Sequence, residues 1–260
     1  MQGAGNDYLY FDCTRAPLED PAAVAARLSD RHFGVGSDGI VLILPSETAD
    51  FRMRMFNADG SEAEMCGNAI RCVGKYIHDR GLSAKNPLKI ETKAGIKTLE
   101  LSIERGAVTR VRVDMGAPEP DSALTLPFSG RDFTLHRVSM GNPHAVIFTG
   151  DPSFEDVHGV GAYFEVHPAF PNHANIEFAQ ILSPAHMKVR VWERGSGETL
   201  ACGTGACAAA VAAVNAGLCE KGREIAVDMP GGQLMIEYDG ETVHLSGPAE
   251  FVCDCECDLI

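Results

Sequence analysis

Two stretches of this 260-residue chain repeat one another at a fixed distance, and this repeat limits the possible folds more than any other feature. Residues 52–81 and 189–217 each read as a strand, a polar turn, a cysteine followed by glycine, and a helix that stops at a glycine. A chance match would not keep one register across unlike residues, so we interpret the chain as an internal duplication. The pairs Asn6 and Asn142, Arg54 and Arg190, Phe56 and Trp192, Cys66 and Cys202, and Gly81 and Gly217 each stand 136 positions apart.

The strand pattern around the two copies indicates where the chain divides. Strand-like segments joined by a turn at Gly106 form a meander that closes the first half, and a group of prolines follows it. The dipeptide Asp20-Pro21 predicts the start of a further short helix. We predict an α+β fold with two pseudo-symmetric domains, residues 1–115 and 116–249. Each domain is expected to be a mostly antiparallel or mixed sheet wrapped around one small-residue helix.

A cysteine at the start of a helix has particular chemistry. The positive end of the helix dipole favours thiolate over thiol, and the first N–H groups of the helix favour an anion such as a carboxylate. Two such halves facing each other would place Cys66 and Cys202 on opposite sides of one cleft. That arrangement suits inversion of a carbon stereocentre, in which a base removes a proton from one face and an acid delivers one to the other.

The composition argues against several classes of function. A net charge of −14 and a pI near 5.0 disfavour nucleic acid and anionic membrane surfaces as partners. No apolar run is long enough to span a bilayer, and no signal segment precedes Gly3. We therefore expect a cytoplasmic protein that binds no nucleic acid and no membrane.

The nine cysteines do not read as a disulfide framework, because the count is odd and the chain is long. Three of them alternate near the C-terminus, where a strand would place all three thiols on one face. We predict a terminal strand over residues 250–260 with these thiols facing the core. A three-thiolate metal site is the alternative, although no partner pair with zinc-like spacing is visible. The three residues are Cys253, Cys255 and Cys257.

The chain resembles a known family, the diaminopimelate epimerases. Members of this family interconvert LL- and meso-diaminopimelate without pyridoxal phosphate, for the synthesis of lysine and peptidoglycan precursors. The matching motifs span nearly the whole chain. The resemblance implies that the C-terminal strand returns to the first domain, that the protein is a homodimer, and that no cofactor or metal is needed. The motifs are GNDYLYFD, HFGVGSDG, FNADGSEAEMCGNAIRC, GNPHAVIF, ANIEF and VWERGSGETLACGTGACAA.

The resemblance also implies a role for each matching residue. Cys66 and Cys202 would form the acid–base pair, with Cys202 as proton acceptor and Cys66 as donor in the LL-to-meso direction. His144 and Glu193 resemble residues that tune the pKa of the two cysteines. The planar guanidinium of Arg194 suits the distal carboxylate of the substrate. The other substrate-binding residues implied are Asn6, Asn57, Gly67, Asn68, Asn142, Asn175, Glu193, Gly203 and Thr204.

Two departures from the family pattern stand out. Many members carry a ligand glutamine where this chain has Gly39, so that contact is not carried over. Members also begin several residues earlier with a strand that ends in Lys-Met, which leads us to hypothesise that Met1 is an internal methionine.

Two other functions remain open. One is a racemase or epimerase of the same fold that acts on another amino acid. The other is a non-catalytic thiol or metal-binding protein that uses the two helix-start cysteines as a redox pair or the C-terminal cysteines as a chelator. Taken singly, turn asparagines and a histidine after proline are most often structural. Only their joint pattern indicates a substrate site.

Overall fold

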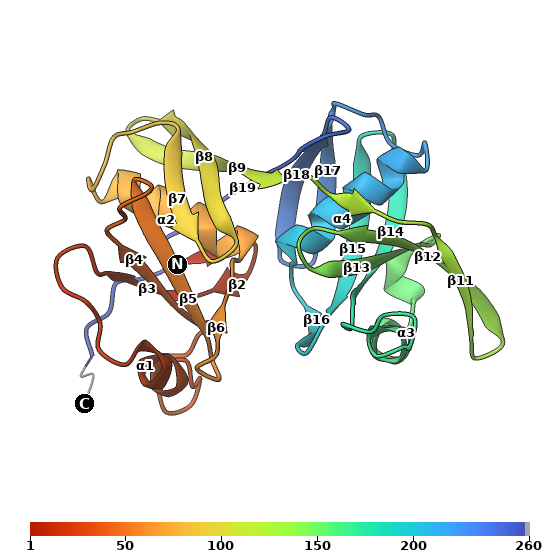
Figure 1. Ribbon diagram of the computed structural model, residues 1–260, viewed down its shortest axis with the longest axis horizontal. Coiled ribbons are helices and arrows are strands. Elements are labelled where there is room, and N and C mark those ends of the chain that lie inside the picture. Colours follow the sequence, from red (N-terminus) through yellow and green to blue (C-terminus); the bar gives the residue numbers. More distant parts are fainter. Residues whose placement is uncertain (258–260) are drawn as a thin grey trace. The chain divides into compact units, whose positions relative to one another are not determined.

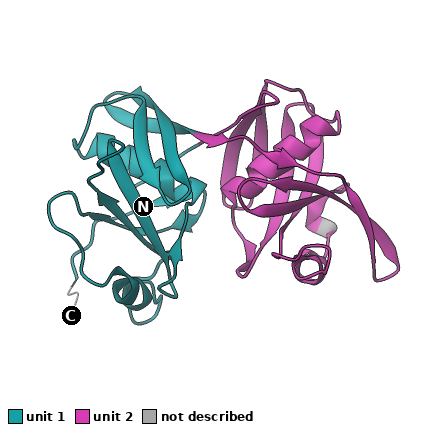
Figure 2. Ribbon diagram, viewed as in Figure 1, with its two compact units in different colours: residues 1–113, 247–260 teal, residues 114–246 magenta. Residues whose placement is uncertain are grey.

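The computed structural model describes residues 1–257, without the side chain of Phe154. The chain forms two compact units, Met1–Val113 with Gly247–Ile260, and Asp114–Ser246. Figure 2 colours these units separately. The chain passes from one unit to the other inside strand β9 (Ala107–Gly116) and again inside β19 (Val243–Gly247).

The first unit has a mixed sheet. Strand β3 runs parallel to β4, β5 runs parallel to β7, and the other strand pairs from β4 to β9 are antiparallel. A short antiparallel pair, β1 and β2, lies at the N-terminus. The elements besides β9 are β1 (Gln2–Gly3), β2 (Asn6–Asp7), β3 (Leu9–Asp12), α1 (Pro21–Leu28), β4 (Gly39–Leu44), β5 (Phe51–Asn57), β6 (Glu62–Ala63), α2 (Gly67–Asp79), β7 (Leu88–Thr92) and β8 (Gly95–Glu104).

The second unit repeats this plan (Figure 1). Strand β13 runs parallel to β14 and β15 parallel to β17, while the remaining ladder pairs are antiparallel. The elements besides β19 are β10 (Glu119–Pro120), β11 (Leu124–Phe128), β12 (Arg131–Ser139), β13 (Pro143–Phe148), η1 (Pro152–Phe154), α3 (Val157–Glu165), β14 (Asn175–Ser183), β15 (His186–Glu193), β16 (Gly197–Thr199), α4 (Gly203–Asn215), β17 (Glu224–Met229) and β18 (Gly232–Tyr238).

The strand register bears out the duplication in detail. Leu9 lies opposite Ile40 in the first unit, and Ala145 lies opposite Ile176 in the second, each residue 136 positions after its counterpart. Even an ion pair is repeated at this spacing. Nε of Arg54 and Oε1 of Glu62 are 2.7 Å apart, and so are the same atoms of Arg190 and Glu198.

The central helices α2 and α4 correspond residue for residue and end in the same way. Gly81 and Gly217, with φ of 73° and 71°, take the left-handed conformation that glycine adopts most readily. In each helix the next residue closes a six-residue turn, because the N–H groups of Leu82 and Leu218 donate to the carbonyls of Ile77 and Ala213. These are the hydrogen bonds of a Schellman motif.

The two sheets enclose these helices. Helix α4 contacts β12, β13, β14, β15, β17 and β18. Ten of its residues are buried, and most of these are alanine. Small side chains let the sheet approach the helix closely on several sides. The expected sheet wrapped around a small-residue helix is therefore confirmed for this unit. Helix α2 is buried over most of its length as well and contacts β1 and β8.

Each unit has a second helix on the outer side of its sheet. Helix α1 begins at Pro21 with the Asp20 side chain accepting from the N–H of Ala23, as predicted. Helix α3 was not predicted from the sequence, because Gly159 and Gly161 lower its helix propensity. Packing stabilises α3, because its buried Val160 and Phe164 belong to one apolar cluster with Ile147, Ile176 and Phe178 of the sheet.

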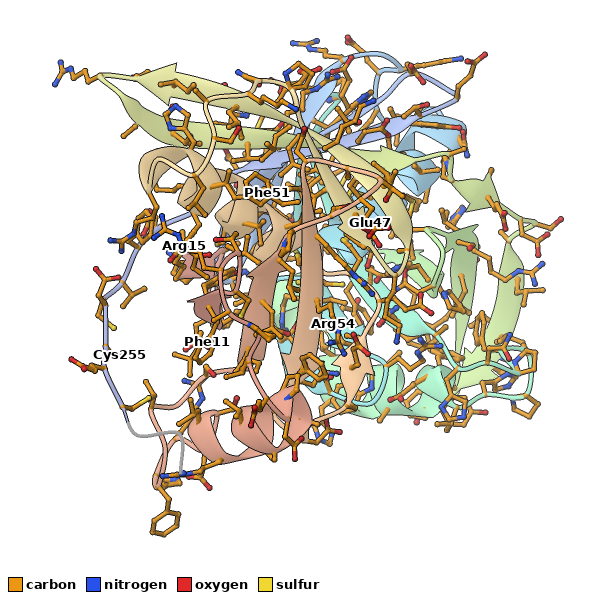
Figure 3. All side chains as sticks on the ribbon, turned by 60° about the vertical axis from the view of Figure 1, so that its left-hand side comes forward. Phe11, Arg15, Glu47, Phe51, Arg54 and Cys255 are labelled. Atoms are coloured by element: carbon orange, nitrogen blue, oxygen red, sulfur yellow. The ribbon has the colours of Figure 1, made fainter. Side chains whose placement is uncertain are left out.

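The prediction of a C-terminal strand over 250–260 is wrong for residues 251–257, which have no strand structure, and residues 258–260 lie outside the described range. Cys253, Cys255 and Cys257 are exposed instead of facing the core. Figure 3 shows Cys255 on this extended segment. Acidic residues alternate with the thiols and favour solvent. One of them, Asp254, forms an ion pair with Arg80 at the end of α2.

Across residues 1–257, none of the helices is long and apolar enough to cross a membrane.

Candidate active site

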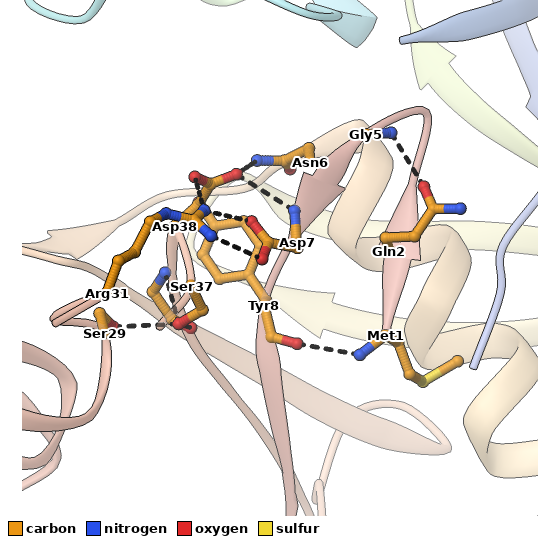
Figure 4. Close-up of polar contacts among 11 residues, drawn as sticks. Met1, Gln2, Gly5, Asn6, Asp7, Tyr8, Ser29, Arg31, Ser37 and Asp38 are labelled. Atoms are coloured by element: carbon orange, nitrogen blue, oxygen red, sulfur yellow. Dashed lines mark hydrogen bonds and ion pairs between the residues drawn. The ribbon is translucent and has the colours of Figure 1, made fainter. Parts of the chain in front are cut away.

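In the first unit, Cys66 is the N-cap residue of α2 and lies beside the N-terminal turn. Its Sγ donates to Oδ1 of Asn6 at 3.3 Å. The other end of this amide donates to the carboxylate of Asp38 at 2.6 Å, and Arg31 bridges Asp38 and Asp7. Figure 4 shows the contact of Asn6 with Asp38 and those of Arg31 with Asp7 and Asp38. Asp38, which Arg31 links to Asp7, therefore fixes the orientation of the Asn6 amide that contacts the Cys66 thiol.

The other predicted residues of this unit follow the same cysteine or end a neighbouring strand. Asn57, the last residue of β5, donates to the Ser61 hydroxyl at 3.1 Å. Gly67 and Asn68 form the first turn of α2 and are buried. The buried guanidinium of Arg71 donates to the Gly67 carbonyl at 2.9 Å and to Oδ1 of Asn68 at 3.0 Å. The Asn68 side chain thus contributes to the helix start.

In the second unit, Cys202 is the N-cap of α4, and its Sγ accepts from the N–H of Gly205 at 3.4 Å. The Thr204 hydroxyl lies 3.5 Å from the same sulfur. Gly203 and Thr204 form the first turn of the helix, whose leading N–H groups have no partners within the helix itself. A backbone of this kind can hold a carboxylate.

The surroundings of the Cys202 thiol act against the effect expected from the helix dipole. Burial raises the pKa of Cys202 well above its ordinary value, and the negative charges of Glu193 and Glu177 raise it further. The hydrogen bonds from Thr204 and from the Gly205 N–H act in the opposite direction but are outweighed. Burial and the two carboxyl groups therefore favour the protonated form of Cys202 and act against the helix dipole.

A chain of polar side chains lies behind Cys202. Nδ2 of Asn142 donates to the Thr204 hydroxyl at 3.4 Å, and Oδ1 of Asn142 lies 3.1 Å from Nε2 of His144. Nδ1 of His144 lies 2.6 Å from Oε1 of Glu177. The side chains of His144 and Glu177 are both 0% exposed. Burial raises the pKa of Glu177, although the charge and hydrogen bond of His144 oppose this rise.

Glu193 ends strand β15 near the same cysteine. Burial raises its pKa, while hydrogen bonds with the Thr199 hydroxyl and with Cys202 act to lower it. Asn175 is buried and committed to backbone, since Nδ2 donates to the Pro143 carbonyl and Oδ1 accepts from the N–H of Arg194. The exposed guanidinium of Arg194 donates to a carbonyl in the preceding loop.

The structure thus places Asn6 beside Cys66, and it places Asn142, with His144 behind it, and Glu193 near the start of α4. The hydrogen bonds of Asn57, Asn175 and Arg194 go to groups outside the two helix starts. The structure also adds one residue that the sequence pattern did not indicate. Glu177 was not singled out, although it is the one polar residue in the stretch IEFA of a buried strand. A carboxylate at such a position requires a buried partner, which here is His144. No group of three or more His, Cys, Asp or Glu side chains in residues 1–257 is arranged to hold a metal ion.

Position 39, where many family members have glutamine, leaves no room for any side chain. Gly39 has φ of 155°, and a Cβ built there would lie 2.1 Å from the carbonyl oxygen of Phe56.

The fold and its two cysteine-capped helices define a class of duplicated α+β proteins, and solved structures of similar fold include isomerases. A hydroxyproline epimerase from Agrobacterium vitis superposes with a TM-score of 0.70 at 14% identity, covering 95% of this chain and 87% of that chain. A phenazine biosynthesis protein of the PhzF family from Bacillus anthracis gives a TM-score of 0.69 at 19% identity, covering 91% and 88%. At these identities the likeness shows the fold alone.

The chain belongs to the diaminopimelate epimerase family. The family model for diaminopimelate epimerase matches residues 1–120 and 136–252. A diaminopimelate epimerase from Acetivibrio thermocellus is 49% identical, with 100% of this chain and 97% of the relative aligned. One from Methanococcus maripaludis strain C5 is 47% identical, with 100% and 98% aligned.

Proposed function

We propose that the chain is an isomerase that converts LL-2,6-diaminopimelate to meso-diaminopimelate by a two-base mechanism, without cofactor or metal, in the synthesis of lysine and peptidoglycan precursors. The observation that carries the proposal is the position of Cys66 and Cys202. Each caps a central helix of the same length at the same position of the repeat. Such a pair provides one base and one acid of the same chemical type.

In this mechanism the two thiols meet on opposite faces of the substrate's α-carbon. A thiolate takes the α-proton from one face, and the thiol of the other cysteine returns a proton to the opposite face. In the LL-to-meso direction Cys202 accepts the proton and Cys66 donates one. After one turnover in this direction Cys202 is a thiol and Cys66 is a thiolate. The reverse reaction starts from this state, so the two cysteines exchange roles.

The substrate carboxylate at the reacting carbon is expected to lie at the two helix starts. N–H groups at Gly67, Asn68, Gly203 and Thr204 would hold it there and stabilise the negative charge that develops as the proton leaves. Arg194 would bind the distal carboxylate with its planar guanidinium. The side chains of Asn6, Asn57, Asn142, Asn175 and Glu193 would complete the site. A homodimer in the cytoplasm is part of the same proposal.

Proton NMR in D2O tests the reaction. With LL-diaminopimelate, we expect the wild-type protein to produce meso isomer that carries solvent deuterium, while unreacted LL isomer stays protonated at low conversion. Cys66→Ala and Cys202→Ala should each lose epimerisation. Cys253→Ala removes an exposed thiol and serves as the matched control that retains it.

Two results would contradict the proposal. Retention of epimerisation in either helix-start variant would exclude the two-base mechanism. A wild-type protein that is inactive on diaminopimelate but racemises another amino acid would establish the alternative substrate class.

A further inference from the structure

The buried pair of Glu177 and His144 behind Cys202 is not explained by folding alone. The Glu177 side chain is 0% exposed, and its Oε1 lies 2.6 Å from Nδ1 of His144. Its Oε2 has no hydrogen-bond partner among the described residues. Burying a carboxyl group with one oxygen unsatisfied costs free energy, so this group requires a reason for being there.

The duplication supplies a control for what the fold requires. The residues at the corresponding positions of the first unit are Val41 and Tyr8, since 177 and 144 lie 136 positions after them. Val41 and Glu177 lie on strands that pair in the same parallel register in both units, and Tyr8 directly precedes the partner strand β3. Val41 is buried there without any charge. The strand position therefore needs only a buried side chain, and the pair of Glu177 and His144 serves something particular to the second unit.

The contacts favour one order of hydrogen-bond donors and acceptors. Because Nδ2 of Asn142 faces the Thr204 hydroxyl, its Oδ1 faces Nε2 of His144, and this ring nitrogen must carry a hydrogen to donate. The 2.6 Å contact on the other side of the ring then holds one more proton between Nδ1 and Glu177. That proton lies on the carboxyl group or on the imidazole, and Nε2 remains a donor in both cases. An uncharged carboxyl group also reduces the cost of the unpartnered Oε2.

This order of donors extends to the cysteine. Thr204 accepts from Asn142, so the hydrogen of its own hydroxyl is available to Sγ of Cys202, 3.5 Å away. A hydroxyl that donates to sulfur stabilises the thiolate, whereas one that accepts from it stabilises the thiol. If Glu177 were absent, Nε2 could lose its hydrogen and repel the amide oxygen. The Asn142 amide would then turn, and the threonine hydroxyl would donate to it instead of to sulfur.

We propose that Glu177 is a positioning residue that keeps the Thr204 hydroxyl turned as a hydrogen-bond donor to the Cys202 sulfur. It acts through His144 and Asn142 and does not touch the reacting atoms. Its effect on turnover rests on the proposed function, in which Cys202 becomes the base in one direction. Its effect on the thiol itself does not depend on any substrate.

Two substitutions separate this role from simple packing. Glu177→Gln keeps the shape and can donate an amide hydrogen to Nδ1 of the histidine, which preserves the hydrogen on Nε2. Glu177→Val inserts the residue that the first unit carries at the same position and removes the partner of the histidine. Each variant is examined by thermal unfolding, by nitrogen-15 NMR of His144, and by the rate at which iodoacetamide alkylates Cys202. Peptide mass spectrometry measures the alkylation rate of Cys202. The alkylation rate of Cys219, another buried thiol, is the internal control.

We expect the glutamine variant to keep the wild-type NMR signature and alkylation rate. The proton that Glu177 shares with His144 offsets the carboxylate charge, so replacing Glu177 leaves the net charge beside Cys202 unchanged. In the valine variant, loss of a hydrogen bond to the charged sulfur therefore reduces the thiolate fraction about tenfold. The greater nucleophilicity of the more basic thiolate offsets about threefold of this reduction, which leaves alkylation about threefold slower. In the epimerase assay, kcat should fall about tenfold in the direction that uses Cys202 as base, while KM changes less than about twofold.

A double-mutant cycle tests the path and covers the case in which Glu177→Val does not fold. Thr204→Val removes the hydroxyl but keeps the backbone N–H, and it should slow alkylation of Cys202 as much as Glu177→Val does. In the combined variant the slowing should not increase further.

Three results would overturn the proposal: wild-type alkylation in Glu177→Val, equal slowing in the glutamine and valine variants, or additive slowing in the double variant. Thr204→Val alkylated at the wild-type rate would overturn it as well. The NMR and alkylation measurements use no substrate. Loss of the proposed function would appear only as a wild-type protein without epimerase activity, so the two failures are distinguishable.

Discussion

Gly205 is the third residue of α4, and replacing it with alanine tests how tightly the buried carboxyl group is held behind Cys202. A Cβ at this position would lie 2.8 Å from Oε1 of Glu177 and 3.4 Å from Sγ of Cys202. The corresponding residue of the first unit is Ala69, which is buried. The helix therefore tolerates alanine at this turn where no carboxyl group lies against it.

Two opposing effects set the size of the change. Alanine in a helix interior is more favourable than glycine by about 1 kcal/mol. Overpacking of a buried site costs about 1–3 kcal/mol, and here Oε1 cannot move away without breaking its contact with His144. We therefore expect Gly205→Ala to lower the free energy of unfolding by roughly 0–2 kcal/mol. For a protein of this size the melting temperature should fall by about 2–4 °C for each kcal/mol.

Thermal unfolding and the alkylation rate of Cys202 measure the result. The added methyl group displaces the carboxyl group, so Cys202 reactivity should change together with stability. In the double variant Gly205→Ala, Glu177→Val the contact is relieved, and most of the lost stability should return. Ala69→Gly is the matched control in the first unit, and it should be destabilising by about 1–2 kcal/mol through lost helix propensity and a lost buried methyl group.

A different outcome would refute this reasoning. If Gly205→Ala raised the melting temperature by the full amount expected from helix propensity, with Cys202 reactivity unchanged, the carboxyl group would not be held against the helix start.

Three further predictions concern other parts of the chain. Gly81→Ala and Gly217→Ala should each cost about 1–2 kcal/mol, because alanine resists the left-handed conformation at both helix ends, and denaturant unfolding of the pair should give similar losses. Burial opposes ionisation of Asp79, but hydrogen bonds from Lys75 and from neighbouring groups outweigh it and lower the pKa of Asp79. Asp79→Asn should therefore cost about 1–3 kcal/mol above about pH 4, the pKa of aspartate in an unfolded chain, and this loss should vanish as the pH falls through the lower pKa of the folded state. A thiol reagent should react at once with the three exposed cysteines of residues 251–257, and a uniform rate over all nine would contradict the structure.

The duplication made much of the architecture predictable, because two copies of one pattern confirm each other. The capped starts of α2 and α4, their glycine stops and the parallel pairing of β13 with β14 follow a single register. Helix α3 escaped prediction because its glycines weaken the local signal, and packing against an apolar layer overrides propensity there. The C-terminal cysteines suggested a strand by alternation alone, but alternation cannot show whether a sheet edge is available.

The sequence by itself determined the fold class, the family and the position of two cysteines at helix starts. These depend on spacing, on turn residues and on motifs that are local in the chain. Only the tertiary structure decided the electrostatic surroundings of Cys202. Glu177 and Glu193 come from different strands, and their effect on the thiol depends on burial and on distances of a few ångströms. Such distances arise from packing between segments far apart in the chain, and a pattern of residues along one segment does not contain them.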